Sequence, residues 1–406
     1  MHCEVICIGT EILLGTTLNT NLSFIGLQLG DCGLSVACEV CIPDTVDDIG
    51  SALQTALDRS DLVITVGGLG PTVDDMTRET IAEILGMRLE YREDEAERIR
   101  RYFSERHVEM PESVLKQAYV PDGAEVIDND YGTAPGLWCP SGNAVVVMLP
   151  GPPRELKPML NNYVLPRVCE RFPPLVSRIN IGISGIGESS IESSVATVLP
   201  DFPDLDVAYC VRRDKVDVRL TAAVDRMDTL ESAAAAVREV LKEYLVDPEH
   251  GVVGSVCNEV RRRAWSLGTA ESCTGGEIAK RITDLAGVSD IFKGALVTYA
   301  NEAKSELLGV RPETVATHGA VSAETAGEMA VGLARRLRVD AGVAVTGIAG
   351  PDGGTPDKPV GLAFISTIVQ GDVRTQRYVH PGDRRRMRDR TTLAALNQLL
   401  RHLRES

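Results

Sequence analysis

Basic residues are in the minority in this 406-residue chain. There are 42 Lys and Arg against 58 Asp and Glu, which gives a formal net charge of -16. A broad nucleic-acid surface needs clustered positive charge to neutralise phosphates, so this balance argues against direct contact with DNA or RNA. Aromatic residues are scarce, at 4%. The hydrophobic content of 44% and the charged content of 25% are those of an ordinary globular protein.

Long apolar runs and a basic leader are also lacking. No segment approaches the length of a membrane span. The opening residues MHCEVICIGTEILLG have no basic region, and Glu4 and Glu11 interrupt their apolar stretch, which is unlike a signal peptide. The ten cysteines are spread out, without the dense spacing of a disulfide-stapled secreted domain. By elimination we expect a cytoplasmic protein with no membrane contact.

Cys38 and Cys41 form the one notable cysteine motif, a CxxC. Such a motif indicates a redox pair or half of a zinc site in some proteins. Here it lies in an apolar segment, residues 36–42, that is typical of a strand, where residues three apart point to opposite faces. We therefore interpret both cysteines as small buried hydrophobic residues.

The length predicts two or three domains, and we place them at residues 1–171, 178–248 and 251–406. In the first, strand-like and helix-like segments alternate, which predicts a doubly wound parallel sheet. The second is a small α/β unit whose strands alternate polar and apolar residues, as in a sheet with one solvated face. Within it, Gly185-Ile-Gly-Glu188 is better interpreted as a turn before a helix than as a binding loop. The third is again α/β.

Two polar loops follow strands of the first domain. Gly9-Thr-Glu11 comes after one apolar strand, and the loop from Gly67 to Asp75 comes after another. Ligands bind beyond the carboxyl ends of parallel strands, so both loops are expected at one crevice. Asp74 and Asp75 are hard oxygen ligands beside a glycine-rich loop suited to phosphate, and Glu11 would complete a metal site. Paired Asp residues after a loop also make good helix N-terminal residues.

In the third domain, Ser272 stands where a strand is expected to end and a helix to begin. Free N–H groups at a helix start attract negative charge, and Gly275 and Gly276 let the backbone approach a ligand. Ser272 and Thr274 add hydroxyls, so a nucleophile and its anion-stabilising donors would come from one loop. The chain has no GxSxG elbow, and no His is nearby in sequence.

A serine without histidine needs another base, and Lys304 is the candidate, because Ser-Lys variants of the catalytic triad are known. Its reference pKa of about 10.4 would have to fall by roughly 3, through burial or a neighbouring cation. Tyr299 would relay a proton. Thr346 stands at the end of another strand, before a glycine-rich loop. Each feature has a plain structural interpretation as a cap, a solvated residue or a turn, but their joint occurrence favours a site.

The chain resembles the CinA family of competence/damage-inducible proteins over essentially its whole length. Four segments of the third domain are similar to the family's C-terminal motifs: Thr269-Ala-Glu-Ser-Cys-Thr-Gly-Gly276, Val297-Thr-Tyr-Ala-Asn-Glu-Ala-Lys304, His318-Gly-Ala-Val-Ser322 and Thr346-Gly-Ile-Ala-Gly-Pro-Asp-Gly-Gly354. The resemblance implies a deamidase that converts nicotinamide mononucleotide to nicotinate mononucleotide and ammonia, without a cofactor.

The roles implied by this resemblance are assigned position by position. Ser272 is the nucleophile and Lys304 the base, with Tyr299 and Thr346 as supporting polar groups. Substrate binding falls to Thr274, Gly275, Gly276, Gly347 and Arg384. Arg384 is the cation for the substrate phosphate, although an exposed helix start in a run of arginines is an equally good interpretation.

The first domain resembles the family's molybdopterin-binding-like domain, through Gly9 to Gly15, Asn19 to Asn21, Gly67 to Asp75 and Gly151 to Glu155. This resemblance implies an ADP-ribose pyrophosphatase that needs a divalent metal, Co²⁺ or Mg²⁺. The implied nucleotide-binding residues are Gly9, Thr10, Glu11, Asn21, Gly67, Gly68, Gly70, Thr72 and Arg154. The implied metal ligands are Asp74, Asp75 and Glu11.

The resemblance also implies a KH-like middle domain and a homodimer. The middle segment has no basic GxxG loop for RNA, so we expect a spacer or a dimerisation element. Two alternatives remain open: an N-terminal domain that only binds a nucleotide or pterin, and an adaptor in DNA uptake or recombination. The acidic charge weighs against direct DNA contact by such an adaptor, but not against protein contact.

Overall fold

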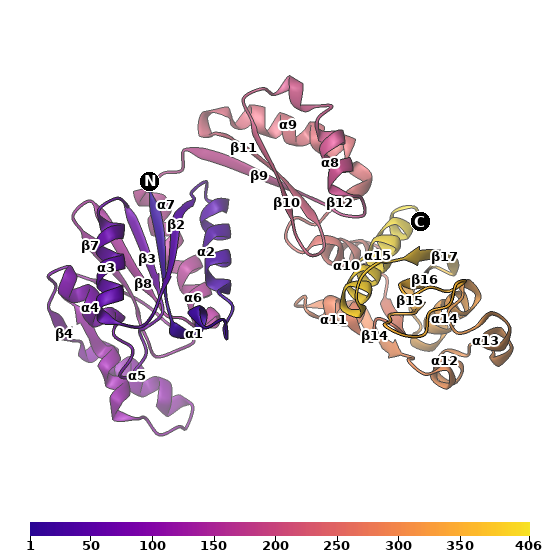
Figure 1. Ribbon diagram of the computed structural model, residues 1–406, viewed down its shortest axis with the longest axis horizontal. Coiled ribbons are helices and arrows are strands. Elements are labelled where there is room, and N and C mark those ends of the chain that lie inside the picture. Colours follow the sequence, from indigo (N-terminus) through magenta and orange to yellow (C-terminus); the bar gives the residue numbers. More distant parts are fainter. The chain divides into compact units, whose positions relative to one another are not determined.

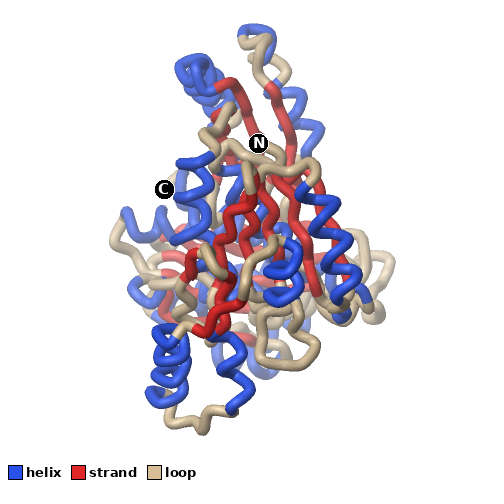
Figure 2. Tube along the Cα trace, turned by 90° about the vertical axis from the view of Figure 1, so that its left-hand side faces the viewer, coloured by secondary structure: helices blue, strands red, loops and turns tan.

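A computed structural model describes all 406 residues. The chain divides into two compact units, one formed by residues 1–178 with 222–227 and the other by residues 179–221 with 228–406. Strands and helices alternate in both units (Figures 1 and 2). No helix combines the length and the apolar character that a membrane crossing would require.

The first unit is built on a six-stranded sheet with the order β2-β1-β3-β8-β7-β6. Its strands are β1 (Cys3–Ile8), β2 (Val36–Ile42), β3 (Leu62–Val66), β6 (Glu125–Ile127), β7 (Gly136–Ser141) and β8 (Ala144–Leu149). The predicted parallel arrangement is confirmed for β2, β1, β3 and β8. β7 and β6 extend the sheet in antiparallel fashion, because Gly142 and Asn143 join β7 to β8 in a tight hairpin.

Helices cover both faces of this sheet, which is why its central strands are buried along their whole length. One hydrophobic cluster packs α2 (Thr20–Asp31), α6 (Pro153–Met159) and α7 (Leu165–Arg171) against one face. A second packs α3 (Val46–Leu57) and α4 (Thr77–Ile84) against the other. Figure 1 shows α2 and α3 on opposite sides. Further elements are α1 (Thr10–Leu13), α5 (Glu93–Glu105), a 3₁₀ helix (Glu112–Ala118), a π-helical turn between α6 and α7 (Leu160–Val164) and the paired strands β4 (Leu89–Tyr91) and β5 (Tyr119–Pro121).

The middle of the chain forms a four-stranded sheet with the order β10-β11-β9-β12. Its elements are β9 (Val176–Ile183), α8 (Glu188–Val195), β10 (Asp206–Val211), β11 (Val216–Ala223), α9 (Met227–Val240) and β12 (Leu245–Val246). Because α8 begins at Glu188, the glycine-containing segment before it is the turn that the sequence predicts.

The last part is a five-stranded sheet with the order β14-β13-β15-β16-β17. Its strands are β13 (Leu267–Glu271), β14 (Phe292–Val297), β15 (Ala341–Gly347), β16 (Leu362–Val369) and β17 (Asp372–Val379). Its helices are α10 (Gly251–Arg262), α11 (Glu277–Thr283), α12 (Asn301–Leu308), α13 (Pro312–His318), α14 (Ala323–Leu337) and α15 (Arg384–Arg404). α10 and α15 pack on one face and α14 on the other. β14, β13 and β15 are parallel, so their carboxyl ends lie at one edge.

The two cysteines of the CxxC motif differ in surroundings, as expected on a strand. Cys41 packs against the cluster under α2. Cys38 instead accepts a hydrogen bond from Arg59. Both are only half-buried rather than buried, because β2 is the edge strand of its sheet. All ten cysteines are free thiols.

Candidate active site

The side chains of Ser272 and Lys304 meet at the carboxyl edge of the last sheet. Ser272 directly follows β13, and its N–H donates to Val345 O at 3.0 Å on the neighbouring strand. Lys304 lies on α12, and its Nζ is 3.2 Å from Ser272 Oγ. The exposed fractions are 7% for Ser272 and 1% for Lys304. A hydroxyl and an amine at this distance are within reach of direct proton transfer.

Lys304 is a buried lysine without a carboxylate partner. Besides Ser272, its Nζ donates to the carbonyl oxygens of Thr298, Tyr299 and Ala300 at 3.0, 3.3 and 3.5 Å. Burial lowers its pKa below the ordinary value, against smaller opposing effects from Cys273 and Glu302. A neutral amine retains two N–H donors for carbonyl oxygens and directs its lone pair at the serine hydroxyl. The surroundings thus favour the form that acts as a base.

The start of α11 is occupied by an internal carboxylate. Glu271, fully buried, accepts from the N–H groups of Gly276, Ile278 and Ala279 at 2.9, 3.1 and 2.9 Å. It also accepts from the Thr269 hydroxyl at 3.2 Å. The expectation that the helix-start amides are free for an anion is therefore wrong for Gly276, because the chain supplies the anion itself.

The amides left beside Ser272 come earlier in the loop. Those of Cys273 and Thr274 donate to no acceptor elsewhere in the chain. The Thr274 hydroxyl is buried without a hydrogen-bond partner, while its carbonyl oxygen accepts from Arg388 at 2.6 Å. Of the two residues, only Cys273 lines the cavity beside Ser272, so its amide is the donor that the loop offers to an anion there.

Tyr299 and Arg384 contact each other at the mouth of the site. Arg384 donates to the Tyr299 hydroxyl at 2.7 Å and to Gly350 O at 2.8 Å. Tyr299 is 59% exposed, and only its backbone oxygen reaches Lys304, so its phenol is not placed as the predicted proton relay. Thr346 is buried, and its hydroxyl donates to Ala320 O at 2.7 Å. It fixes the wall of the site and makes no hydrogen bond with Ser272.

These groups surround a cavity of about 190 Å³. Its lining is Ser272, Cys273, Tyr299, Asn301, Lys304, Ala320, Val321, Thr346, Gly347, Ala349 and Arg384. Thr274, Gly275 and Gly276 lie outside the lining, in the loop behind it. Lys358, which sequence reasoning missed, donates to His318 O at 2.6 Å and to Val321 O at 2.8 Å and so holds one wall. In the sequence Lys358 is a lysine in a glycine-rich loop, and no motif there indicates such a contact.

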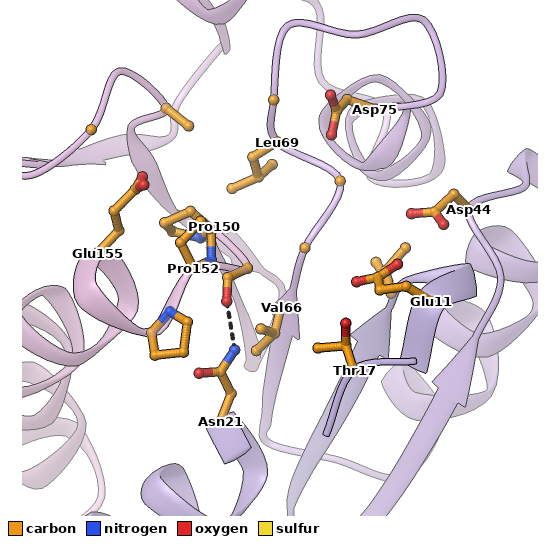
Figure 3. A pocket seen from close by; sticks show the side chains of 18 of the residues that line it. Glu11, Thr17, Asn21, Asp44, Val66, Leu69, Asp75, Pro150, Pro152 and Glu155 are labelled. Carbon is orange, nitrogen blue, oxygen red and sulfur yellow. Dashed lines mark hydrogen bonds between the residues drawn. The ribbon is translucent and has the colours of Figure 1, made fainter. Parts of the chain in front are cut away.

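A larger cavity of about 630 Å³ lies in the first unit, at the carboxyl ends of its parallel strands (Figure 3). Of the predicted nucleotide-binding and metal residues, the lining includes Glu11, Asn21, Gly67, Gly68, Gly70, Asp74, Asp75 and Arg154. Gly9, Thr10 and Thr72 are beside it but not in it. Asn21 crosses the floor of the cavity and donates to Gly151 O at 2.7 Å.

Two glycines of this cavity are required by the backbone. Gly67 has φ of +110°, and a side chain there would place its Cβ 2.2 Å from Ile8 O. Gly68 has φ of +67°, and its Cβ would lie 2.0 Å from the Thr77 hydroxyl. Any other residue is strained at both positions. Because both glycines pack closely against Ile8 and Thr77, the loop after β3 can run along the cavity.

The acidic residues line this cavity from separate sides (Figure 3). Asp75 accepts hydrogen bonds from the amide and the hydroxyl of Thr72. Hydrogen bonding from Thr72 also lowers the pKa of the Asp74 carboxyl, which is ionised at neutral pH. Asp74, Asp75 and Glu11 do not bring three oxygens within 4.8 Å of one another. Sequence reasoning missed Asp44, which accepts from Thr10, and Glu155, which accepts from Asn129 at 2.9 Å.

The chain matches two family models. Residues 250–403 match the CinA C-terminal domain, and residues 4–170 match a probable molybdopterin binding domain. A CinA-like protein of Dictyoglomus thermophilum is 38% identical over 99% of both chains, and a putative competence-damage inducible protein of Moorella thermoacetica is 41% identical over 100% of this chain and 99% of its own. This chain belongs to the CinA family. A solved CinA structure from Thermoplasma acidophilum covers 40% of this chain and 96% of its own, with 41% identity and a TM-score of 0.38.

Each of the two matched segments contains one of the two cavities. The 630 Å³ cavity lies within residues 4–170 and the 190 Å³ cavity within residues 250–403. The middle sheet lies outside both matched segments. The names of the CinA relatives describe competence and damage induction and state no reaction.

Proposed function

We propose that the C-terminal domain hydrolyses the amide of nicotinamide mononucleotide. The contact between Lys304 Nζ and Ser272 Oγ supports this most strongly. Ser272 Oγ attacks the carboxamide carbon while its proton passes to Lys304 Nζ, and the oxyanion is received by the amide of Cys273, which lines the cavity. Lys304 then returns the proton to the leaving nitrogen, and ammonia departs. Water, deprotonated by Lys304, cleaves the acyl-enzyme to nicotinate mononucleotide and free Ser272.

The size and charge of the site fit this substrate. A cavity of about 190 Å³ holds a pyridine ring rather than a whole nucleotide, so the ribose phosphate would extend toward the mouth. Arg384 stands there, anchored by Gly350 and Tyr299, with further N–H donors for a phosphate. We propose it as the phosphate-binding cation, with Gly347 lining the ring and Thr274, Gly275 and Gly276 shaping the loop.

The test is ammonia release from nicotinamide mononucleotide by the full chain and by Ser272→Ala and Lys304→Met. We expect both variants to lose about 10³-fold or more in kcat, because each removes half of one proton-transfer pair. Ser305→Ala, next to Lys304 on α12, is the matched control and should retain activity. Equal activity of the wild type and Ser272→Ala would exclude this nucleophile.

We further propose that the N-terminal domain hydrolyses ADP-ribose to AMP and ribose 5-phosphate. A cavity of about 630 Å³ is of nucleotide size. Mg²⁺ is usually held by one or two carboxylates together with substrate phosphates, and Asp74 and Asp75, with Glu11 across the cavity, fit that mode better than a closed cage. A bound Co²⁺ or Mg²⁺ would neutralise pyrophosphate charge. Arg154 and the loop from Gly67 to Gly70 would bind the nucleotide.

Release of AMP from ADP-ribose, with and without a chelator, tests this second activity. We expect the double variant Asp74→Asn with Asp75→Asn to lose AMP release and to keep ammonia release unchanged. Ser272→Ala should lose ammonia release and keep AMP release. The alternative is a domain that binds a nucleotide or pterin without cleaving it, which needs no metal ion between the separated carboxylates. Binding of ADP-ribose without AMP release would identify that case. We propose a cytoplasmic homodimer as the working form, to be checked by sedimentation.

A further inference from the structure

Two thiols and a carboxylate converge at the edge of the N-terminal sheet, outside the chemistry described above. Cys7 on β1 and Cys41 on β2 are direct partners in the register of the two strands, so their side chains leave the same face. Glu39 lies two residues before Cys41 and shares that face. The sulfur atoms and a carboxylate oxygen of these residues all lie within 4.8 Å of one another.

A single donor atom stands at the point where these groups converge. Asn19 Nδ2 donates to Glu39 Oε1 at 2.8 Å and to Cys7 Sγ at 3.2 Å, and it lies 3.7 Å from Cys41 Sγ. Asn19 is held there because its Oδ1 accepts from Leu22 N at the start of α2. The three acceptors surround the positively polarised NH₂ group of one amide, and a cation would bind the same three acceptors.

We propose that Cys7, Cys41 and Glu39 form a binding site for a thiophilic divalent ion of the zinc class. Two thiolates and a carboxylate are ligands of zinc and cadmium, whereas Mg²⁺ prefers oxygen alone. On binding, each thiol releases its proton to solvent and no electron is transferred. Three protein ligands leave the fourth position of a tetrahedral ion for water or for a reoriented Asn19 amide.

The position of the site allows an ion to enter and to affect the neighbouring cavity. Glu39 is exposed and Cys41 half-buried, on the edge strand β2 (Figure 1). Asn19, which the ion would displace, also lines the 630 Å³ cavity and caps α2. Two of the three ligands of this site are thiolates, whereas Asp74, Asp75 and Glu11 offer only carboxylates. Because an ion bound here would displace Asn19, it would also change the lining of the 630 Å³ cavity.

The experiment titrates Cd²⁺ into the reduced, chelator-treated full chain in excess Mg²⁺, which fills oxygen sites. Thiolate-to-cadmium charge-transfer absorption in the ultraviolet reports sulfur ligation. We expect one Cd²⁺ per chain for the wild type. Affinity should fall at least about tenfold in Cys41→Ser and about tenfold in Glu39→Gln. Cys38→Ser is the matched control, because Cys38 is on the same strand but faces away, and it should bind like the wild type.

Circular dichroism and thermal unfolding of the metal-free variants check their folding. Cys7→Ser should lose affinity as Cys41→Ser does. If Cys7→Ser fails to fold because Cys7 is fully buried, Cys41→Ser and Glu39→Gln decide the question. Absence of charge-transfer absorption in the wild type would overturn the proposal. So would undiminished binding by Cys41→Ser, which would assign the ion to another cysteine such as Cys32 or Cys169.

Discussion

Lys304 Nζ lies 3.2 Å from Ser272 Oγ, although the two residues are 32 positions apart in the chain. They come from different elements, a loop after β13 and the helix α12, and meet because β13 and β14 are parallel neighbours whose carboxyl ends share one edge. Lys304 is buried with no acidic partner, so the loss of solvation governs its protonation. Two predictions follow from this arrangement.

The first concerns the pH dependence of ammonia release. Because burial lowers the pKa of Lys304 below 10.5, the neutral base is present above that lowered value and is lost as pH falls through it. We expect kcat/KM for nicotinamide mononucleotide to rise with pH and level off below pH 10.5. Lys304→Arg, which stays charged, should lose about 10³-fold or more at every pH. Appreciable activity of that variant would remove Lys304 from the role of base.

The second prediction concerns stability. Between the lowered pKa of the folded chain and the ordinary value of 10.5, the unfolded chain binds more protons at Lys304, so this residue makes stability rise with pH there. Lys304→Met has no such proton. We expect the stability of Lys304→Met relative to the wild type to be greater at about pH 7 than near pH 10, by about 1.4 kcal/mol for each tenfold change in the acid constant, because the lost hydrogen bonds to carbonyl oxygens cost the same at both pH values. Urea unfolding at both pH values measures the difference, and a gap that does not change with pH would contradict it.

The parallel strands and their order of appearance were predictable from the sequence, because a buried parallel strand is a continuous apolar run followed by a polar loop. Residues 62–66 before Gly67 and residues 341–345 before Thr346 show this pattern. The antiparallel strands β7 and β6 were not predicted. Residues 136–141 include a proline and two small residues, which are not typical of a strand. The hairpin through Gly142 can be recognised only when β8 is already known to be the neighbouring strand.

The site was predictable in its two principal residues and less so in its supporting contacts. Ser272 and Lys304 are polar residues in motifs of one module, and topology brings them together. The role of Glu271 was hidden, because an acidic residue at the end of a strand gives no sign that its carboxylate turns back to cap α11. The pairing of Tyr299 with Arg384 was hidden too, since it joins residues 85 positions apart through side-chain conformation alone.

The third prediction tests Arg384 as a phosphate-binding residue. A charge-assisted contact of about 1.5–3 kcal/mol corresponds to a roughly 10–100-fold loss of kcat/KM in Arg384→Gln. The loss should appear mainly in KM, because the phosphate is remote from the amide. Nicotinamide riboside, which lacks the phosphate, should be hydrolysed equally by the wild type and the variant. Arg385→Gln is the neighbouring control, and an equal loss on the riboside would show that Arg384 acts on the fold of the mouth instead.

The fourth prediction concerns Glu271, whose buried carboxylate accepts three backbone N–H groups of the α11 start. Glu271→Gln replaces one acceptor oxygen with an NH₂ group, which then faces amide donors. Bonds to a charged acceptor are worth about 1.5–3 kcal/mol each, and an unmatched buried donor costs about 1–3 kcal/mol. We expect the C-terminal domain to lose about 2–4 kcal/mol of stability by urea unfolding.

Because the same amides fix the loop that carries Ser272, kcat of Glu271→Gln should also fall, by about 10-fold or more, under conditions where the variant remains folded. Glu277→Gln is the matched control. Glu277 is on the first turn of α11, but its carboxylate pairs with the side chains of Arg213 and Arg281 and accepts no backbone N–H group of the helix start. Equal effects of the two substitutions would mean that the internal carboxylate does not position the loop, and that the Ser272 geometry is maintained by β13 and β15 alone.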